Sequence, residues 1–109
     1  MSVALLIEQI DGQQSDCYTP ISSEAFFTTY WRPLIEKESY AWLRLMQSGL
    51  TITEEDLPEV LHELHQLKQA VPRYYPVNSG PYWHMEERLI TLISELEALV
   101  GKQVQLFIG

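Results

Sequence analysis

The stretch TEEDLPEVLHELHQLKQAV, residues 53–71, is the best-specified part of the chain. Apolar side chains recur in it at every third or fourth position, which places them on one stripe of an α-helix. They are Leu57, Val60, Leu61, Leu64, Leu67 and Val71. Thr53 or Asp56 can cap the helix, and Asp56 is preferred because Pro58 then occupies the second helical position, where its missing N–H costs nothing. Pro72 is expected to end the helix.

The chain before this helix begins with a predicted strand over residues 2–10, with apolar groups on both faces in its first part. The dipeptide Asp11-Gly12 follows and favours a tight hairpin turn, since both residues tolerate positive φ. Residues 14–19 are mostly polar and are predicted to return as an edge strand, with a loop as the alternative.

An aromatic helix is expected next, capped by Ser22 or Ser23. Pro33 cannot continue a helix without losing a hydrogen bond, so this helix should stop or kink near Trp31. Residues 36–38 then form an exposed turn. Ser39 is expected to cap a second helix over residues 40–48.

The remaining boundaries are marked by glycine and proline. Gly49 suits the end of the second helix, and residues 50–52 are short and extended. Residues 72–81 are expected to be irregular because they hold three prolines and a glycine. Pro81 opens the last helix after a cap at Ser79 or Gly80, and Gly101 closes it. Residues 103–108 alternate as in a half-buried strand.

These elements predict a single α+β domain spanning residues 1–109. About four helices would cover one face of a small, mostly antiparallel sheet. About three strands would form this sheet, namely the N-terminal hairpin and the C-terminal strand. No apolar run is long enough to cross a membrane, and the first ten residues lack the basic start and small-residue cleavage site of a signal peptide. The one cysteine, Cys17, cannot form an internal disulfide, which fits a cytoplasmic location.

The net charge of −8 is unevenly distributed. Residues 1–60 hold ten acidic residues against three basic ones, whereas residues 61–109 hold five against four. Such a surface repels phosphate backbones and anionic membranes, so nucleic acid and membrane partners are disfavoured. It would attract a basic protein partner, although acidic residues also serve solubility alone.

No catalytic signature or cofactor motif is present. Glu59 and His62 form a Glu-x-x-His pair, and His65 follows three residues after His62. A di-iron site needs two such pairs, and a zinc site needs a third ligand that is not evident. Solvated histidines are therefore expected, and a small metal-dependent enzyme remains an alternative function. A further alternative is a structural or regulatory adaptor, or a homodimer built on an exposed edge strand or aromatic patch.

Several segments together resemble small immunity proteins of bacterial polymorphic toxin systems. Short N-terminal strands lead into the segment EAFFTT at residues 24–29, and the helix over residues 40–48 ends at Gly49-Leu50. A Glu-rich helix containing the segment LHEL, residues 61–64, precedes a proline- and tryptophan-containing loop and a Leu/Ile helix.

The resemblance implies a cytoplasmic protein that binds a cognate toxin domain and blocks it without catalytic residues or a cofactor. Many toxin domains are basic nucleases, which an acidic surface could cover. We expect contacts from acidic residues and from exposed aromatic residues near the loop before the last helix. The expected contact residues are Glu36, Glu38, Glu54, Glu55, Glu59, Tyr74, Tyr75 and Trp83.

Overall fold

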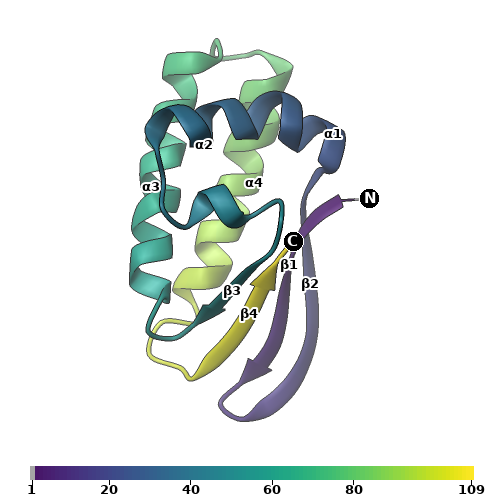
Figure 1. Cartoon of the computed structure of the whole chain (residues 1–109), viewed down its shortest axis with the longest axis vertical. Helices are drawn as coiled ribbons and strands as arrows, with labels where there is room; N and C mark the ends of the chain where they lie inside the picture. The colour runs from purple at the N-terminus through teal and green to yellow at the C-terminus, as the bar shows by residue number, and fades with distance from the viewer. Residues whose placement is uncertain (1) are drawn as a thin grey trace.

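The computed structural model describes residues 2–109 as an α+β domain in which helices pack on an antiparallel sheet (Figure 1). The sheet has four strands in the order β2-β1-β4-β3, one more than expected. They are β1 (Ser2–Ile10), β2 (Gln13–Ser23), β3 (Leu50–Thr53) and β4 (Val104–Ile108). The extended segment after Gly49 supplies the additional strand by pairing with β4.

The hairpin between β1 and β2 is confirmed, and β2 is an edge strand, longer than expected. Asp11 and Gly12 have φ values of 50° and 80°, as the tight turn requires. β4 lies between β1 and β3, so the first and last strands are neighbours: Leu5 pairs with Ile108.

One continuous helical segment follows β2 and comprises α1 (Glu24–Phe26), a π-helical turn η1 (Phe27–Trp31) and α2 (Arg32–Glu38). Ser23 caps it, because its hydroxyl accepts the Phe26 N–H at 3.2 Å. The helix does not stop near Trp31 as one alternative predicted: it passes through the π turn, and Pro33 lies in the first turn of α2. Residues 36–38 are therefore the last turn of α2, and their prediction as a separate turn is wrong.

The prediction of a second α-helix over residues 40–48 is also wrong. Ser39 ends α2 in the left-handed conformation, with φ of 58°, and only one 3₁₀ turn, η2 (Leu43–Leu45), follows. When the continuous segment from α1 to α2 is counted as one helix, residues 2–109 contain three helices and this short turn, rather than about four helices.

The central helix is α3 (Leu57–Tyr74), and Asp56 occupies the N-cap position as predicted, although its side chain makes no capping hydrogen bond to the helix. Its carboxylate turns back to accept the N–H and the hydroxyl of Thr53, both at 3.1 Å. The prediction that Pro72 ends the helix is wrong, because α3 continues to Tyr74 with the exposed Pro72 ring in its last turn. The irregular stretch is therefore limited to residues 75–79. Helix α4 (Gly80–Glu97) starts after Ser79, whose hydroxyl accepts the Tyr82 N–H at 3.3 Å.

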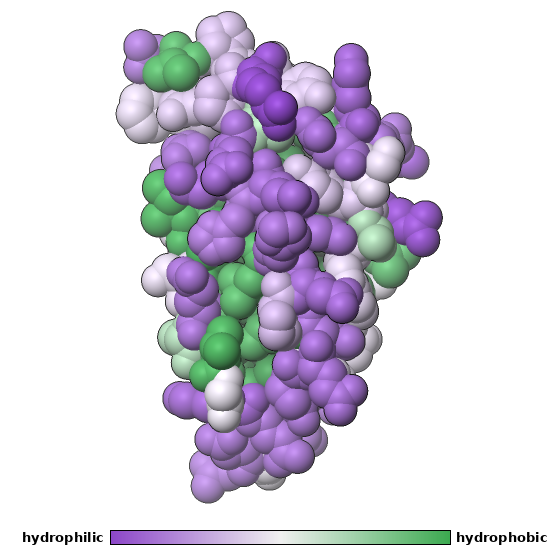
Figure 2. Space-filling view, turned by 90° about the vertical axis from the view of Figure 1, so that its left-hand side faces the viewer, coloured by the Kyte–Doolittle hydropathy of each residue, from purple (hydrophilic) through white to green (hydrophobic). Residues whose placement is uncertain are grey.

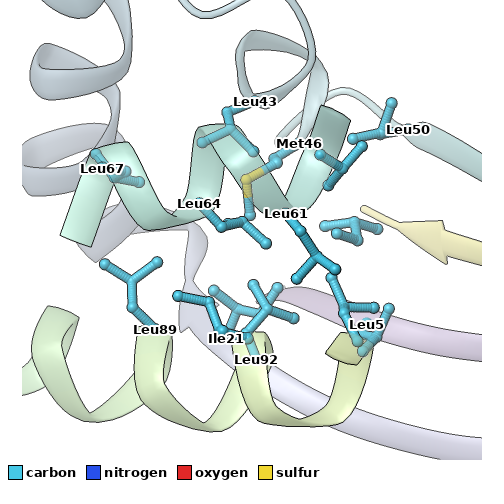
Figure 3. Packing of buried hydrophobic residues seen from close by; sticks show 14 of the residues in the cluster. Leu5, Ile21, Leu43, Met46, Leu50, Leu61, Leu64, Leu67, Leu89 and Leu92 are labelled. Carbon is cyan, nitrogen blue, oxygen red and sulfur yellow. The ribbon is translucent and has the colours of Figure 1, made fainter. Parts of the chain in front are cut away.

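The core lies between the sheet and helices α3 and α4 (Figure 3). Inward-facing strand residues such as Leu5 belong to one buried cluster with Leu64 of α3 and Leu92 of α4, and all three are almost fully buried. Leu43 and Met46 anchor the η2 segment on α3 from the other side, and both are fully buried. Because each such side chain contributes about 1.5–3 kcal/mol on burial, this core fixes the helices that carry the polar surface.

Candidate functional site

A polar groove separates the end of α2 and the turn after it from the outer side of α3. Its volume is about 480 Å³. It is lined by Glu38, Ser39, Tyr40, Ala41, His62, Glu63, Gln66, Gln69 and Arg73. The outer side of α3 lies on a face that is mostly hydrophilic, with small hydrophobic areas (Figure 2). The groove therefore suits a polar or charged partner group better than an apolar one.

Glu38 forms one wall of the groove, and its carboxylate is held by two groups from the end of α3. Its Oε1 accepts the Tyr74 hydroxyl at 3.1 Å and an Arg73 Nη2–H at 3.2 Å. The pair with Arg73 is largely exposed, so it contributes little to the free energy of unfolding, but it orients the carboxylate. Within residues 2–109, Glu38 Oε2 has no hydrogen-bond partner and remains available to a binding partner.

Glu63 occupies the opposite wall and receives three backbone N–H groups from the segment that replaces the expected second helix. The donors are Ala41 at 3.2 Å, Trp42 at 2.9 Å and Leu43 at 3.1 Å. One turn earlier on α3, Glu59 accepts the indole N–H of Trp42 at 2.9 Å. These two carboxylates together fix the segment before η2 against α3.

The tyrosines at this end of the molecule stay protonated well into alkaline solution. Burial, and secondly the neighbouring Glu38 carboxylate, raise the pKa of Tyr40 to about 12. Desolvation and the hydrogen bond to Glu38 raise the pKa of Tyr74. Both hydroxyls are therefore hydrogen-bond donors beside the groove at neutral pH.

The structure brings only some of the expected contact residues together. Glu38 and Tyr74 are in direct contact at one end of the groove, and Glu59 lies near the other end, next to Glu63. Glu36 is exposed one half-turn before Glu38 and pairs with Arg32 at 2.9 Å.

The other expected contact residues lie elsewhere. Glu55 is exposed in the turn before α3, whereas Glu54 turns away and accepts the Val104 N–H at 3.3 Å. Tyr75 points inward, and its hydroxyl donates to the Tyr30 carbonyl at 2.6 Å. Trp83, on the first turn of α4, is 56% exposed and meets Tyr82 edge to face. The eight residues thus form a groove group and scattered neighbours, not one patch.

Sequence reasoning missed Glu63, Arg73 and Tyr40 as groove residues. Glu63 had a usable signal, because it lies four residues after Glu59 and so on the same row of α3. The other two could not be found, since their position depends on how the turn after α2 packs on α3.

The histidines do not converge. His62 lines the groove, whereas His65 faces α4 and lies 3.6 Å from Glu97. Within residues 2–109, no group of three or more His, Cys, Asp or Glu side chains is arranged to hold a metal ion. In the same residues, no helix is both long and apolar enough to cross a membrane.

Comparison with protein-family models, curated proteins and solved structures found no match for this chain. The functional argument therefore rests on the geometry and charge of the groove.

Proposed function

We propose that the protein is a binding module that neutralises a bacterial toxin domain by covering a basic surface of that domain. The supporting observation is a pair of oriented carboxylates, that of Glu38 in the wall of the polar groove and that of Glu59, one turn of α3 before the groove residue Glu63. Each is held by neighbouring side chains, so little side-chain entropy is lost when a lysine or arginine of the partner binds. This function requires no bond-making step, and it would be exercised in the cytoplasm.

The charge distribution supports the same partner chemistry. Glu36 and Glu55 are exposed outside the groove, and the first 60 residues hold most of the excess negative charge. Such a surface accelerates the encounter with a basic protein and orients it, more strongly at low salt. We therefore expect the association rate, more than the dissociation rate, to depend on these residues.

Co-expression with the toxin gene adjacent to the gene of this protein tests the proposal. Rescue of growth and recovery of a one-to-one complex by pull-down are expected. Failure of both would contradict the proposal.

The groove is tested with Glu38→Gln combined with Glu59→Gln. Glutamine keeps an oxygen that accepts from Tyr74 or Trp42 but removes the charge. The double variant should slow association about tenfold at low ionic strength and less at high ionic strength. Glu87→Lys, at an exposed position on α4, is the control and should leave the rate nearly unchanged. An unaffected double variant would remove the groove from the interface.

A further inference from the structure

The uncovered face of the sheet carries a row of large side chains that crosses three strands. Leu6 of β1 pairs with Tyr18 of β2 on one side and with Phe107 of β4 on the other. Directly paired residues point to the same face of a sheet, so the three side chains lie next to one another. Inward-facing neighbours such as Leu5 and Leu106 are fully buried, so this row lies on the opposite side, away from the helices.

Two of the three side chains are open to solvent: Tyr18 is 55% and Leu6 is 36% exposed. Phe107 is half-buried because its ring lies over Gly49 and Gly109, where a Cβ atom would come within 3.3 Å and 2.6 Å of ring carbons. The two glycines thus leave the space that the ring occupies. An oriented aromatic ring beside exposed apolar groups is typical of a protein-contact surface.

The charge next to this row is negative. The four strands contain no lysine or arginine, and their acidic residues are Glu8 and Asp16. Both line a polar depression of about 530 Å³ at the end of the sheet nearer the hairpin turn, together with Gln14 and Ser15. Glu8 is tied to the uncovered face, because Gln105 of β4 lies 3.4 Å from its carboxylate.

We propose that the row of Leu6, Tyr18 and Phe107 docks a protein segment that presents an apolar side chain flanked by lysine or arginine. The row would receive the apolar group, and Glu8 and Asp16 would pair with the basic groups. A second copy of this chain is disfavoured, because facing sheets would bring like charges together and each copy carries −8. Nucleic acid and anionic lipid are repelled by the same carboxylates.

This surface is separate from the groove between α2 and α3, since the sheet and its inward-facing side chains lie between them. The inference therefore goes beyond the proposed function and does not depend on it.

The test is an NMR titration of the ¹⁵N-labelled protein with two short peptides of matched length. In one, lysine alternates with phenylalanine, and in the other glutamate replaces lysine. The lysine peptide should shift the amide signals of Leu6, Tyr18 and Phe107 and bind at least about fivefold more tightly than the glutamate peptide. The double variant Leu6→Thr with Tyr18→Thr, which keeps β-propensity, should lose these shifts. Val100→Thr removes an exposed apolar group outside the sheet and should keep them.

Three outcomes would overturn the inference. The shifts fall on the α2–α3 groove and not on the strands, or the two peptides bind equally, or light scattering shows a dimer that the double variant dissociates. The mapping on the unaltered protein decides the first two even if the double variant does not fold. A toxin complex that maps to the groove supports the proposed function whatever the peptides show, so the two proposals can fail separately.

Discussion

The Glu63 carboxylate of α3 accepts the backbone N–H of Trp42, 21 residues earlier in the chain, at 2.9 Å. It also accepts the N–H groups of Ala41 and Leu43, and so acts as a cap supplied by another helix. A single acidic side chain thereby satisfies three donors that would otherwise lack partners.

Glu63→Ala should therefore lower the free energy of unfolding by about 2–3 kcal/mol, because three N–H groups lose their charged acceptor. Glu63→Gln should cost less, since one acceptor oxygen remains. Urea unfolding measures both changes. Gln66→Ala, on the same side of α3 and exposed, is the control and should change stability by less than about 0.5 kcal/mol. Equal stability of Glu63→Ala and the control would refute the capping role.

Gly49→Ala should be destabilising for two reasons. Its φ of +128° is strained for any residue with a side chain, and the added Cβ would approach the Phe107 ring to 3.3 Å. We expect a loss of about 1–3 kcal/mol in thermal or urea unfolding. Gly80→Ala is the matched control, since a Cβ at this helical position meets nothing within 4 Å, and it should be neutral or stabilising by up to about 1 kcal/mol.

The ring of His84 packs on Phe26, with 4.0 Å between centroids, and its buried Nδ1 has no hydrogen-bond partner within residues 2–109. Burial, and secondly Arg88, lower the pKa of His84 below its ordinary 6.5. Below pH 6.5 the unfolded chain therefore binds more protons than the folded one, so stability should fall as the pH is lowered from that value. Melting temperatures should be measured from about pH 8 to about pH 5, a range that spans the ordinary histidine pKa. They should fall on the acid side of this range.

In His84→Phe this part of the acid dependence should disappear. The exposed His62→Gln variant is the control and should retain it. An acid dependence that is the same in His84→Phe and in the unaltered protein would assign the effect to other groups.

At high pH the same reasoning applies to Tyr40, whose pKa is raised rather than lowered in the folded state. Its folded pKa of about 12 exceeds the ordinary value of 10.0. The stabilisation is complete below pH 10 and should be lost as the pH rises towards 12. Ultraviolet absorbance of tyrosinate should show late-titrating groups, since the pKa values of Tyr74 and Tyr75 are also raised, and Tyr40→Phe should remove one of them. Titration of all six tyrosines near pH 10 would contradict the assignment.

The sequence predicted those parts of the fold that depend on local pattern. The apolar stripe of α3, its start after Asp56 and the Asp11-Gly12 hairpin are confirmed because each is specified by neighbouring residues. The failure at residues 39–48 involves long-range packing. Serine is a common N-cap residue, yet Ser39 ends α2 instead of starting a helix. The N–H groups that follow it are satisfied by Glu63 and need no helix of their own.

In the candidate site, too, some features follow from the sequence alone and others depend on long-range packing. The acidic character of the first 60 residues follows from composition, but the groove depends on how the turn after α2 meets α3. Tyr75, in a proline-rich stretch, was expected either to cover an edge of the core or to contact a partner. Its hydroxyl donates to Tyr30, a contact across 45 residues that no local pattern encodes.

The central place of β4 in the sheet has a consequence for how the protein is made. β3 pairs only with β4, and β1 pairs with β4 on the side away from β2. While the ribosome is still synthesising residues 104–108, β3 has no partner and the sheet cannot close over the core. Nascent chains should therefore remain open, and sensitive to proteases or in need of chaperones, until residues 104–108 leave the exit tunnel.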